Sequence, residues 1–175
     1  YSYRDESYNG PGDPSADGSL LSGGVGQLTD GIVGQDIWSA DLGNGYAYEW
    51  VGWSSIQPSI TLDCGQPESI DIVAVHSNNQ STGGVHLWNS VEVAVSDDGS
   101  TFRELPSYTT TAGQRANTQA RFIAIPVEAR ARFIRLSFDS AGEWIFLSEI
   151  VVCCDTDVVG PFVTGSAPSG LTNVT

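Results

Sequence analysis

The sequence predicts an all-β fold, a β-sandwich of about eight or nine short antiparallel strands. Apolar and polar residues alternate with a period of two in several short runs, which is typical of strands that bury one face. The chain has 20 Gly and 8 Pro, which suit many turns. No segment keeps a helical periodicity of apolar residues beyond a turn or two.

The expected strands follow one another along the chain, separated by turn signals. Residues 1–27 are expected to hold a first strand and an irregular loop, and residues 34–49 a long polar loop. Residues 50–53 lead through Pro58 into the next strand, and strands are expected at residues 59–65, 70–76, 90–96, 102–105, 121–126, 133–138 and 144–152. The turn at residues 97–100 predicts a hairpin, Pro106 is expected to end the strand after it, and residues 109–118 are expected to form a loop.

The domain organisation is predicted from a change in composition near the C-terminus. Residues 1–154 are expected to form one domain, since their number suits a single sizeable core. Residues 155–175 are rich in Gly, Pro, Ser and Thr and predict a linker or a strand-donating tail. The chain begins at Tyr1 without Met, which is expected of a processed mature protein or an excised domain.

The charge and composition restrict the partners. Seven basic against 21 acidic residues give a net charge of −14, which argues against binding nucleic acid or an anionic membrane. The same acidity suits cation binding, or serves solubility alone. There is no run of about 18 apolar residues, so we expect no transmembrane segment. Few basic residues, no Met and many Ser, Thr and Gly predict a secreted, extracellular protein.

The three cysteines leave the pairing open. Cys153 and Cys154 are adjacent and would point to opposite faces of a strand, so Cys64 is expected to reach one of them. We expect a Cys64–Cys153 disulfide, with Cys64–Cys154 and reduced thiols as the alternatives.

Glu149 is the one charged residue in the apolar run 144–152. Burying a bare carboxylate is very costly, so this side chain must be paired or bound to something.

Five motifs in order carry a resemblance to a known family. They are Leu28-Thr29-Asp30-Gly31, Trp50-Val51-Gly52-Trp53, Ile60-Thr61-Leu62-Asp63-Cys64-Gly65, the segment 91–99 and the segment 132–152. Together, over roughly residues 3–152, they resemble the discoidin-like (coagulation-factor type C) domains, which include the family 32 carbohydrate-binding modules. Cys64 stands where Leu is commoner in that family.

The resemblance implies a galactose-binding-like jelly roll with recognition loops at one end, the 139–143 loop among them. It also implies a structural calcium ion, held by a turn aspartate and a carboxylate of the last strand, which by motif position are Asp30 and Glu149. The alternative is that Asp30 only caps its turn, while Glu149 pairs with Arg132 or Arg135.

The candidate ligand-binding residues are aromatic and polar side chains in the predicted loops. Flat rings stack on sugar faces, and short polar side chains bind hydroxyl groups. The candidates are Tyr46, Tyr48, Asn78, His86, Trp88, Arg115 and Asn117, with Tyr46 and Tyr48 the best stacking platform. The resemblance implies that the tryptophans at positions 50 and 53 lie in the core.

Asn79 and Asn173 begin glycosylation sequons. For catalysis, none of the motifs that place a nucleophile beside a base, a zinc-binding pair or a phosphate-cradling loop is present, so we expect no enzyme.

Two functions remain open from the sequence. The first is a non-catalytic extracellular module that binds carbohydrate or another cell-surface or matrix ligand. The second is a structural subunit of an extracellular filament, sheath or matrix, assembled with copies of itself through its tail and edge strands.

Overall fold

The computed structural model describes residues 2–5, 28–35, 50–54 and 57–153 of the chain. Tyr46, Tyr48, Cys154 and Asn173 lie outside the described residues, and so does the predicted tail. The elements in chain order are β1 (Ser2–Asp5), β2 (Val51–Ser54), β3 (Ser59–Ser77), the 3-10 turn η1 (Ser81–Gly83), β4 (Ser90–Ser96), β5 (Arg103–Thr109), α1 (Ala112–Ala116), β6 (Arg121–Asp139) and β7 (Trp144–Cys153).

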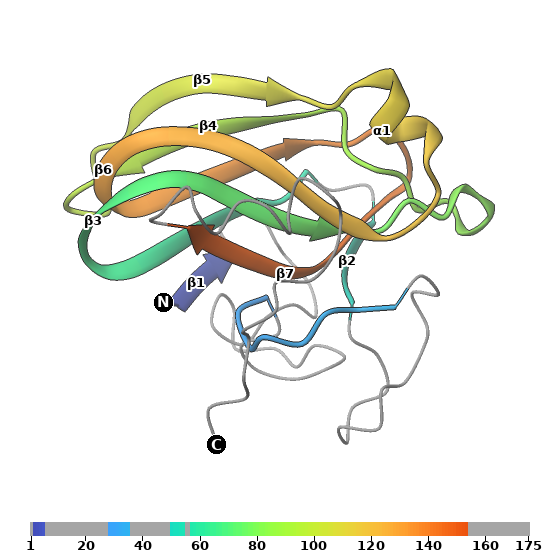
Figure 1. Ribbon diagram of the computed structural model, residues 1–175, viewed down its shortest axis with the longest axis horizontal. Helices are drawn as coiled ribbons and strands as arrows, with labels where there is room; N and C mark the ends of the chain where they lie inside the picture. The colour runs from blue at the N-terminus through green and yellow to red at the C-terminus, as the bar shows by residue number, and fades with distance from the viewer. Residues whose placement is uncertain (1, 6–27, 36–49, 55–56, 154–175) are drawn as a thin grey trace.

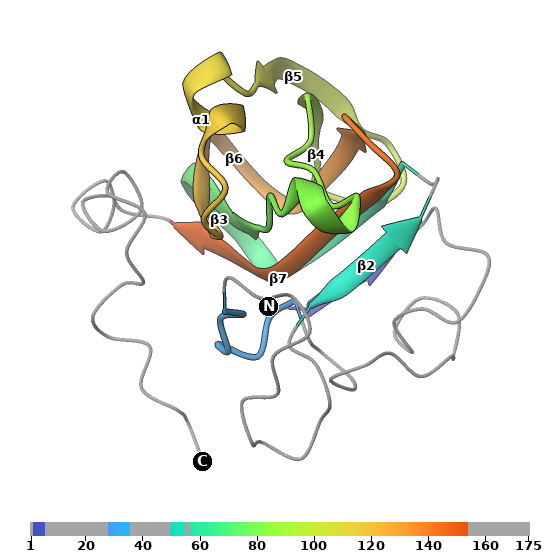
Figure 2. The ribbon, with the colours of Figure 1, turned by 90° about the vertical axis from the view of Figure 1, so that its right-hand side faces the viewer.

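All pairs of these strands are antiparallel, and hydrogen bonds connect them in the order β2-β7-β3-β6-β4-β5, with β1 added to β3. β3 and β6 pair with each other along most of their length and change register where they bend. The first half of β3 and the second half of β6 form one layer with β1, β4 and β5, whereas their other halves form a second layer with β7 and β2 (Figures 1 and 2). The predicted all-β sandwich is therefore confirmed.

The strand count differs from the prediction because β3 and β6 run through both layers. The segments 59–65 and 70–76, predicted as separate strands, are the two halves of β3, and the segments 121–126 and 133–138 are halves of β6. The described residues thus hold seven strands. Turn residues such as Gly65 and Pro67 bend β3, but the chain on both sides of the bend keeps its pairing with β6.

The core lies between the two layers and is built from alternate strand residues. Ile60 and Leu62 of β3 are fully buried against Ile134 and Leu136 of β6, as the period-two pattern requires. Trp53 is 2% exposed and Trp50 is 3% exposed, so the prediction that both are core residues is confirmed.

Two local predictions between β4 and β6 are wrong. β5 continues through Pro106 to Thr109, because an edge strand tolerates a missing N–H donor. The expected loop at 109–118 contains α1, which begins with a capping box: the Thr111 hydroxyl accepts from Gln114 N, and the Gln114 side chain accepts from Thr111 N. This Thr-x-x-Gln spacing is a sequence signal for a helix start.

No helix within the described residues is long and apolar enough to cross a membrane.

The sandwich has two ends with different character. The loop end consists of residues 78–89, 110–120 and 140–143, which include η1 and α1, on the right in Figure 1. The hairpin end, on the left, consists of the turn at residues 97–102 between β4 and β5 and the bends of β3 and β6.

The predicted disulfide is wrong, because Cys64 and Cys153 are not bonded to each other. Cys153 is buried in a small cluster with Ala74 and Phe122, whereas Cys64 packs against the main core. The strand register explains the separation: Cys153 lies opposite Ile72, well along β3 from Cys64. A disulfide requires Cα atoms within about 7 Å of each other.

Candidate functional site

The loop end is held together by the side chain of Asn79. Its Nδ2 donates to the carbonyl oxygens of Arg115 and Asn117 at 2.8 and 2.7 Å, and its Oδ1 accepts from Leu87 N at 2.9 Å. Asn79 is 5% exposed, so these bonds are largely shielded from water. One amide thus connects the segments 78–89 and 110–120 of the loop end.

The third loop, at residues 140–143, is joined to the first by backbone and side-chain contacts. His86 N donates to Trp144 O, and Trp144 N donates to Gly84 O, both at 3.1 Å. Gly142 lies directly against the His86 ring, since a Cβ at this position would be 2.2 Å from His86 Cδ2. Only glycine allows this approach. The side chain of Asn89 also donates to Ser140 O at 3.3 Å.

The joined loops present His86, Arg115 and Asn117 at the surface: His86 is half-buried, and the other two are exposed. These three predicted ligand-binding residues therefore share one end of the fold, linked through Asn79.

Two residues of this end were missed by the sequence analysis. Trp144 begins β7 at the rim of the loops and is half-buried, with its ring edge-on to Phe146. Its position directly after the Gly142-Glu143 turn was the available signal.

Arg121, at the start of β6, donates through Nη2 to Gln114 O, but its Nη1 is buried and has no hydrogen-bond acceptor among the described residues. Burial lowers the pKa of this guanidinium. The sequence offered no signal for this unsatisfied donor, because it depends on how the loops fold over β6.

Three predictions at this end are wrong because the side chains are buried. Trp88 is 0% exposed, packs edge-on against Tyr108 and Phe138, and is a core residue. Asn78 is also 0% exposed and uses its Oδ1 to accept from Gln80 N. The Nδ2 of Asn79, where a glycan would be attached, is occupied by two carbonyl groups in the interior, so this sequon is not a glycosylation site in this fold.

The remaining predicted positions of the ligand and glycosylation sets, Tyr46, Tyr48 and Asn173, lie outside the described residues.

A second candidate site lies on β7, where a bulge turns two polar side chains toward the segment 28–35. His76 of β3 pairs with Glu149 and Ser77 pairs with Leu147, so Ser148 is an extra residue in β7. Glu149 Oε2 accepts from Gly31 N at 3.0 Å, and Ser148 Oγ accepts from Gly34 N at 3.0 Å. Gly31 has φ of 83°, a conformation that favours glycine.

Glu149 is a buried carboxyl without a cationic partner among the described residues. It is 2% exposed. Burial raises the pKa of Glu149 to about 9; the Gly31 N–H counteracts this in part, and the charge of Asp30 adds to it. The predicted arginine partners lie elsewhere: Arg132 forms an ion pair with Asp63 at 2.8 Å, and the Arg135 guanidinium lies over the Phe102 ring at 4.0 Å. The arginine alternative for Glu149 is therefore wrong.

Asp30 and Glu149 fit a hard cation in donor type and in charge. The fold brings both carboxylates to one place, and a buried, uncompensated carboxylate beside a second one is what a divalent ion would neutralise. Asp30 Oδ1 also accepts from Ile32 N at 2.8 Å, so it caps its turn as well. The described residues contain no group of three or more His, Cys, Asp or Glu side chains for a metal, so further ligands would be carbonyl oxygens or water.

His76 and Ser148 form a buried pair beside this site. His76 Nδ1 lies 2.7 Å from Ser148 Oγ, and the imidazole ring stacks on Trp50 with 5.1 Å between centroids. Burial lowers the pKa of His76 to about 3, so the ring is neutral at physiological pH. The serine is 0% exposed and already holds Gly34 N, so the pair connects β3 and β7 to the segment 28–35 rather than facing a substrate.

Comparison with known proteins finds relatives over almost the whole described region. A family model for the DS-like domain of discoidin domain-containing receptor 1/2 matches residues 1–153. Epithelial discoidin domain-containing receptor 1 of Homo sapiens is 32% identical over 152 residues, covering 79% of this chain and 16% of the relative. Discoidin domain-containing receptor tyrosine kinase B of Caenorhabditis elegans is 27% identical over 155 residues, covering 85% and 18%. The chain thus spans less than a fifth of the length of these curated relatives.

Solved structures share the fold at low sequence identity. The lectin domain of Lectinolysin, complexed with Lewis B antigen, has a TM-score of 0.54 and 11% identity, covering 89% of this chain and 93% of that domain. CBM32-1 from a family 31 glycoside hydrolase of Clostridium perfringens has a TM-score of 0.52 and 15% identity, covering 85% and 92%. The predicted galactose-binding-like jelly roll is therefore confirmed.

Proposed function

We propose that this chain, which belongs to the DS-like domain family of discoidin domain-containing receptors 1 and 2, is a non-catalytic extracellular binding module. The membership confirms the resemblance to discoidin-like domains. Within this function, we assign ligand binding to the loop end and take carbohydrate as the first ligand class, with a cell-surface or matrix ligand as the broader one.

The observation that carries this proposal is the rigid convergence of three loops on one end of the sandwich. Asn79 and Gly142 hold these loops in one arrangement, so the side chains they carry are positioned before a ligand arrives. Preorganisation lowers the entropic cost of binding.

The side chains themselves suit a hydroxylated ligand. The half-buried Trp144 offers an aromatic ring, and His86, Arg115 and Asn117 offer hydrogen-bonding groups around it. A surface of this kind combines stacking with polar contacts, as sugar recognition requires.

The test is a glycan array probed with this chain, with and without calcium chelator. We expect binding to a subset of glycans, weakened at least about tenfold by Trp144→Ala or His86→Ala, since each removes contacts worth more than 1.4 kcal/mol. The matched control, scored on uncharged glycans alone, is Phe102→Ala, which removes a half-buried aromatic ring at the hairpin end. Equal loss in all three variants would contradict the assignment to the loop end.

The alternative function, a structural subunit of an extracellular filament, sheath or matrix, is an outcome of the same test. Absence of binding to any glycan, together with polymers that grow with protein concentration, would replace the binding module by this alternative. Of its two proposed contacts, the tail lies outside the described residues, and the edge strand β5 carries an exposed Pro106, which disfavours strand addition.

Calcium is proposed as a structural ion of this module, with Asp30 and Glu149 as side-chain ligands. The support is the buried carboxyl of Glu149, which lies near Asp30 and has no cationic side chain beside it among the described residues; burial raises its pKa to about 9. In this role the ion would join the segment 28–35 to β7 and would take no part in chemistry.

A further inference from the structure

We propose that the hairpin end holds a second binding site, for an oxyanion group flanked by hydroxyls, the chemistry of an acidic sugar unit. The site is a pocket of about 150 Å³ at the opposite end of the sandwich from the loop end. Its walls come from the β4–β5 hairpin and from the residues that follow the bend of β6.

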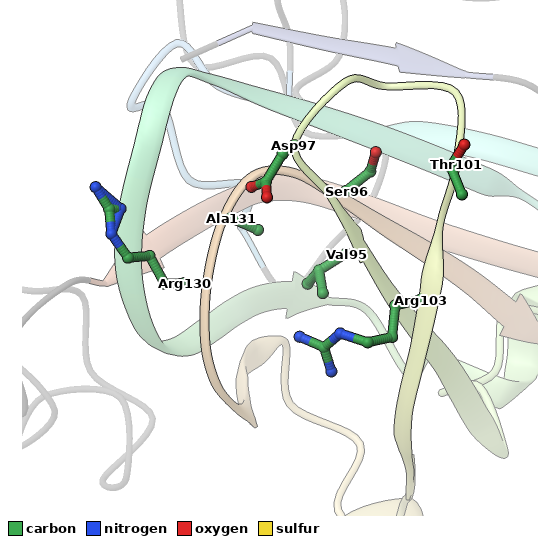
Figure 3. A pocket seen from close by; sticks show the side chains of 7 residues that line it. All are labelled: Val95, Ser96, Asp97, Thr101, Arg103, Arg130 and Ala131. Atoms are coloured by element: carbon green, nitrogen blue, oxygen red, sulfur yellow. The ribbon is translucent and has the colours of Figure 1, made fainter.

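The pocket concentrates positive charge in a strongly acidic chain. It is lined by Arg103 and Arg130, two of only seven basic residues in a sequence with 21 acidic ones. Figure 3 shows Arg103 projecting from β5 toward Val95, whereas the Arg130 side chain extends from β6 away from Val95 and Arg103, at the rim of the pocket. At physiological ionic strength the screening length is about 8 Å, so these nearby charges outweigh distant ones for a bound group.

Arg103 is the stronger argument for a ligand. It is exposed, and its side chain makes no ion pair or hydrogen bond with the described residues, although Asp97 lines the same pocket. Guanidinium groups bind carboxylate and sulfate with two parallel hydrogen bonds, and this one has all of its donors available. Arg130 donates to Pro67 O at 2.9 Å, which holds its guanidinium at the rim of the pocket, where it adds positive charge.

The rest of the wall suits hydroxyl groups and a ring. Asp97 presents a carboxylate that accepts hydrogen bonds from hydroxyls, and it would repel a bare anion. Thr101 adds a hydroxyl, and Val95 and Ala131 form an apolar base. A ligand that carries both an anionic group and hydroxyls suits Arg103 and Asp97 together, with the charge of Arg130 at the rim. A long polyanion is disfavoured, because the net charge of −14 repels it at a distance.

The backbone around the pocket is held in place on both sides. Asp98 Oδ1 accepts from Ser100 N and Thr101 N, both at 2.8 Å, and Ser96 Oγ accepts from Gly99 N at 3.0 Å, which fixes the turn that carries Asp97. On the other side, β6 has one more residue than β3 between the pairs Ile70–Ala129 and Ile72–Pro126.

This bulge is strained. Glu128 within it has φ of 49°, which is the only positive φ of a non-glycine residue in the described part of the chain. Strained bulges of this kind are found next to functional sites, and this one lies two residues before Arg130.

The experiment is an NMR titration of the isotopically labelled chain with four probes: sodium glucuronate, glucose 6-sulfate, glucose and inorganic sulfate. We expect saturable amide shifts at residues 96–103 and 129–131 with the first two probes, and none there with glucose. Glucuronate and glucose 6-sulfate separate the carboxylate source from the sulfate source. If neither probe shifts these amides, the proposal is overturned, whatever happens at the loop end.

Three variants sharpen the test. Arg103→Gln is expected to weaken glucuronate binding by about tenfold or more, the effect of losing a charge-assisted pair of hydrogen bonds. Arg135→Gln is the control, because it removes the same charge from β6 outside the pocket and should change the affinity less than about twofold. Equal losses of glucuronate affinity in Arg103→Gln and Arg135→Gln would show that only the overall charge matters and would overturn the site. Asp97→Asn should weaken glucuronate and strengthen inorganic sulfate; unchanged glucuronate affinity would overturn the hydroxyl contact.

Discussion

Asn79 and Glu149 are two buried polar side chains that differ in how many hydrogen-bond partners they have. Asn79 at the loop end is 5% exposed and makes three hydrogen bonds, two as donor and one as acceptor. Glu149 on β7 is 2% exposed, has one backbone N–H as its donor, and is near the charge of Asp30. Both residues connect a loop to the sandwich, but only one does so without an electrostatic penalty.

The difference separates a structural group from a candidate ion site. A neutral amide whose hydrogen bonds are all made in the interior stabilises one arrangement of the loops. A buried carboxyl with one donor must either take up a proton or bind a cation, because its charge is otherwise uncompensated. Variants at the two positions should therefore change stability in opposite directions.

The largest effect is expected from Asn79→Ala. This change leaves Leu87 N and the carbonyl groups of Arg115 and Asn117 without their partner in the interior, which should lower the free energy of unfolding by about 3–5 kcal/mol. Urea denaturation monitored by tryptophan fluorescence measures it.

Ser81→Ala is the matched control, because it destroys the same sequon and changes only an exposed side chain. It should leave the free energy of unfolding within about 0.5 kcal/mol of the original. If Asn79→Ala unfolds at the same urea concentration as this control, the amide does not hold the loops.

The next effect, of opposite sign, is expected from Glu149→Gln. The carboxyl has a pKa of about 9 in the folded chain against 4.5 as its ordinary value, so the folded state binds more protons and loses stability as the pH rises between these values. In chelator at pH 7.5 the variant should be more stable by roughly 2–4 kcal/mol, since each pH unit contributes up to about 1.4 kcal/mol.

Calcium should stabilise the unmodified chain relative to Glu149→Gln, the reverse of the order expected in chelator. Added calcium should raise the melting temperature of the unmodified chain and leave that of Glu149→Gln unchanged. Asp30→Asn is the companion variant: it should weaken the calcium effect while leaving Glu149 in place. An identical melting temperature of the unmodified chain with calcium and with chelator would contradict the proposed calcium site.

A third effect concerns His76, whose pKa is lowered from 6.5 to about 3. Between pH 6.5 and about 3 the unfolded chain binds a proton at this histidine and the folded chain does not. The free energy of unfolding therefore falls as the pH falls below 6.5. Between pH 6.5 and 4.5 this slope opposes that of Glu149, and in chelator the two should nearly cancel. Glu149→Gln alone should therefore lose roughly 2–3 kcal/mol over that range.

Adding His76→Gln to that variant should abolish the loss of stability between pH 6.5 and 4.5. Thermal unfolding at several pH values measures this loss. A slope that persists in the double variant would assign the acid sensitivity to other groups.

The smallest effect is expected from Asp63→Asn, which breaks the ion pair with Arg132. The side chains of the pair are 39% and 29% exposed for Arg132 and Asp63, and water screens their attraction, although the contact lowers the pKa of Asp63. The melting temperature should change little, and less at high salt than at low salt. A loss as large as that of Asn79→Ala would show that partly exposed charges matter as much as the buried amide.

Much of this molecule was predictable from local patterns. Period-two alternation identified Ile60, Leu62, Ile134 and Leu136 as core residues, and the apolar run around Glu149 marked this carboxylate as buried. Both are properties of neighbouring residues on one strand, so a single sequence contains them.

The loop end was predicted less well, because burial there depends on contacts between segments distant in sequence. Trp88 and Asn79 both lie in the stretch between β3 and β4, where the sequence gives no sign that their side chains are buried. Their burial comes from Tyr108, Phe138 and the carbonyl groups of the 110–120 loop, which only the fold brings together. Arg121 was missed for the same reason.

The sequence by itself determined the fold class, the family, the core strands and the need of Glu149 for a partner, because strand periodicity and motif order are local in the chain. Only the tertiary structure decided which residues these side chains contact. It placed Asp30 rather than an arginine beside Glu149, turned Asn79 inward, separated Cys64 from Cys153, and gathered Arg103 and Arg130 around one pocket. Such contacts join residues far apart in sequence, and strand register and bulges, which no local pattern specifies, set them.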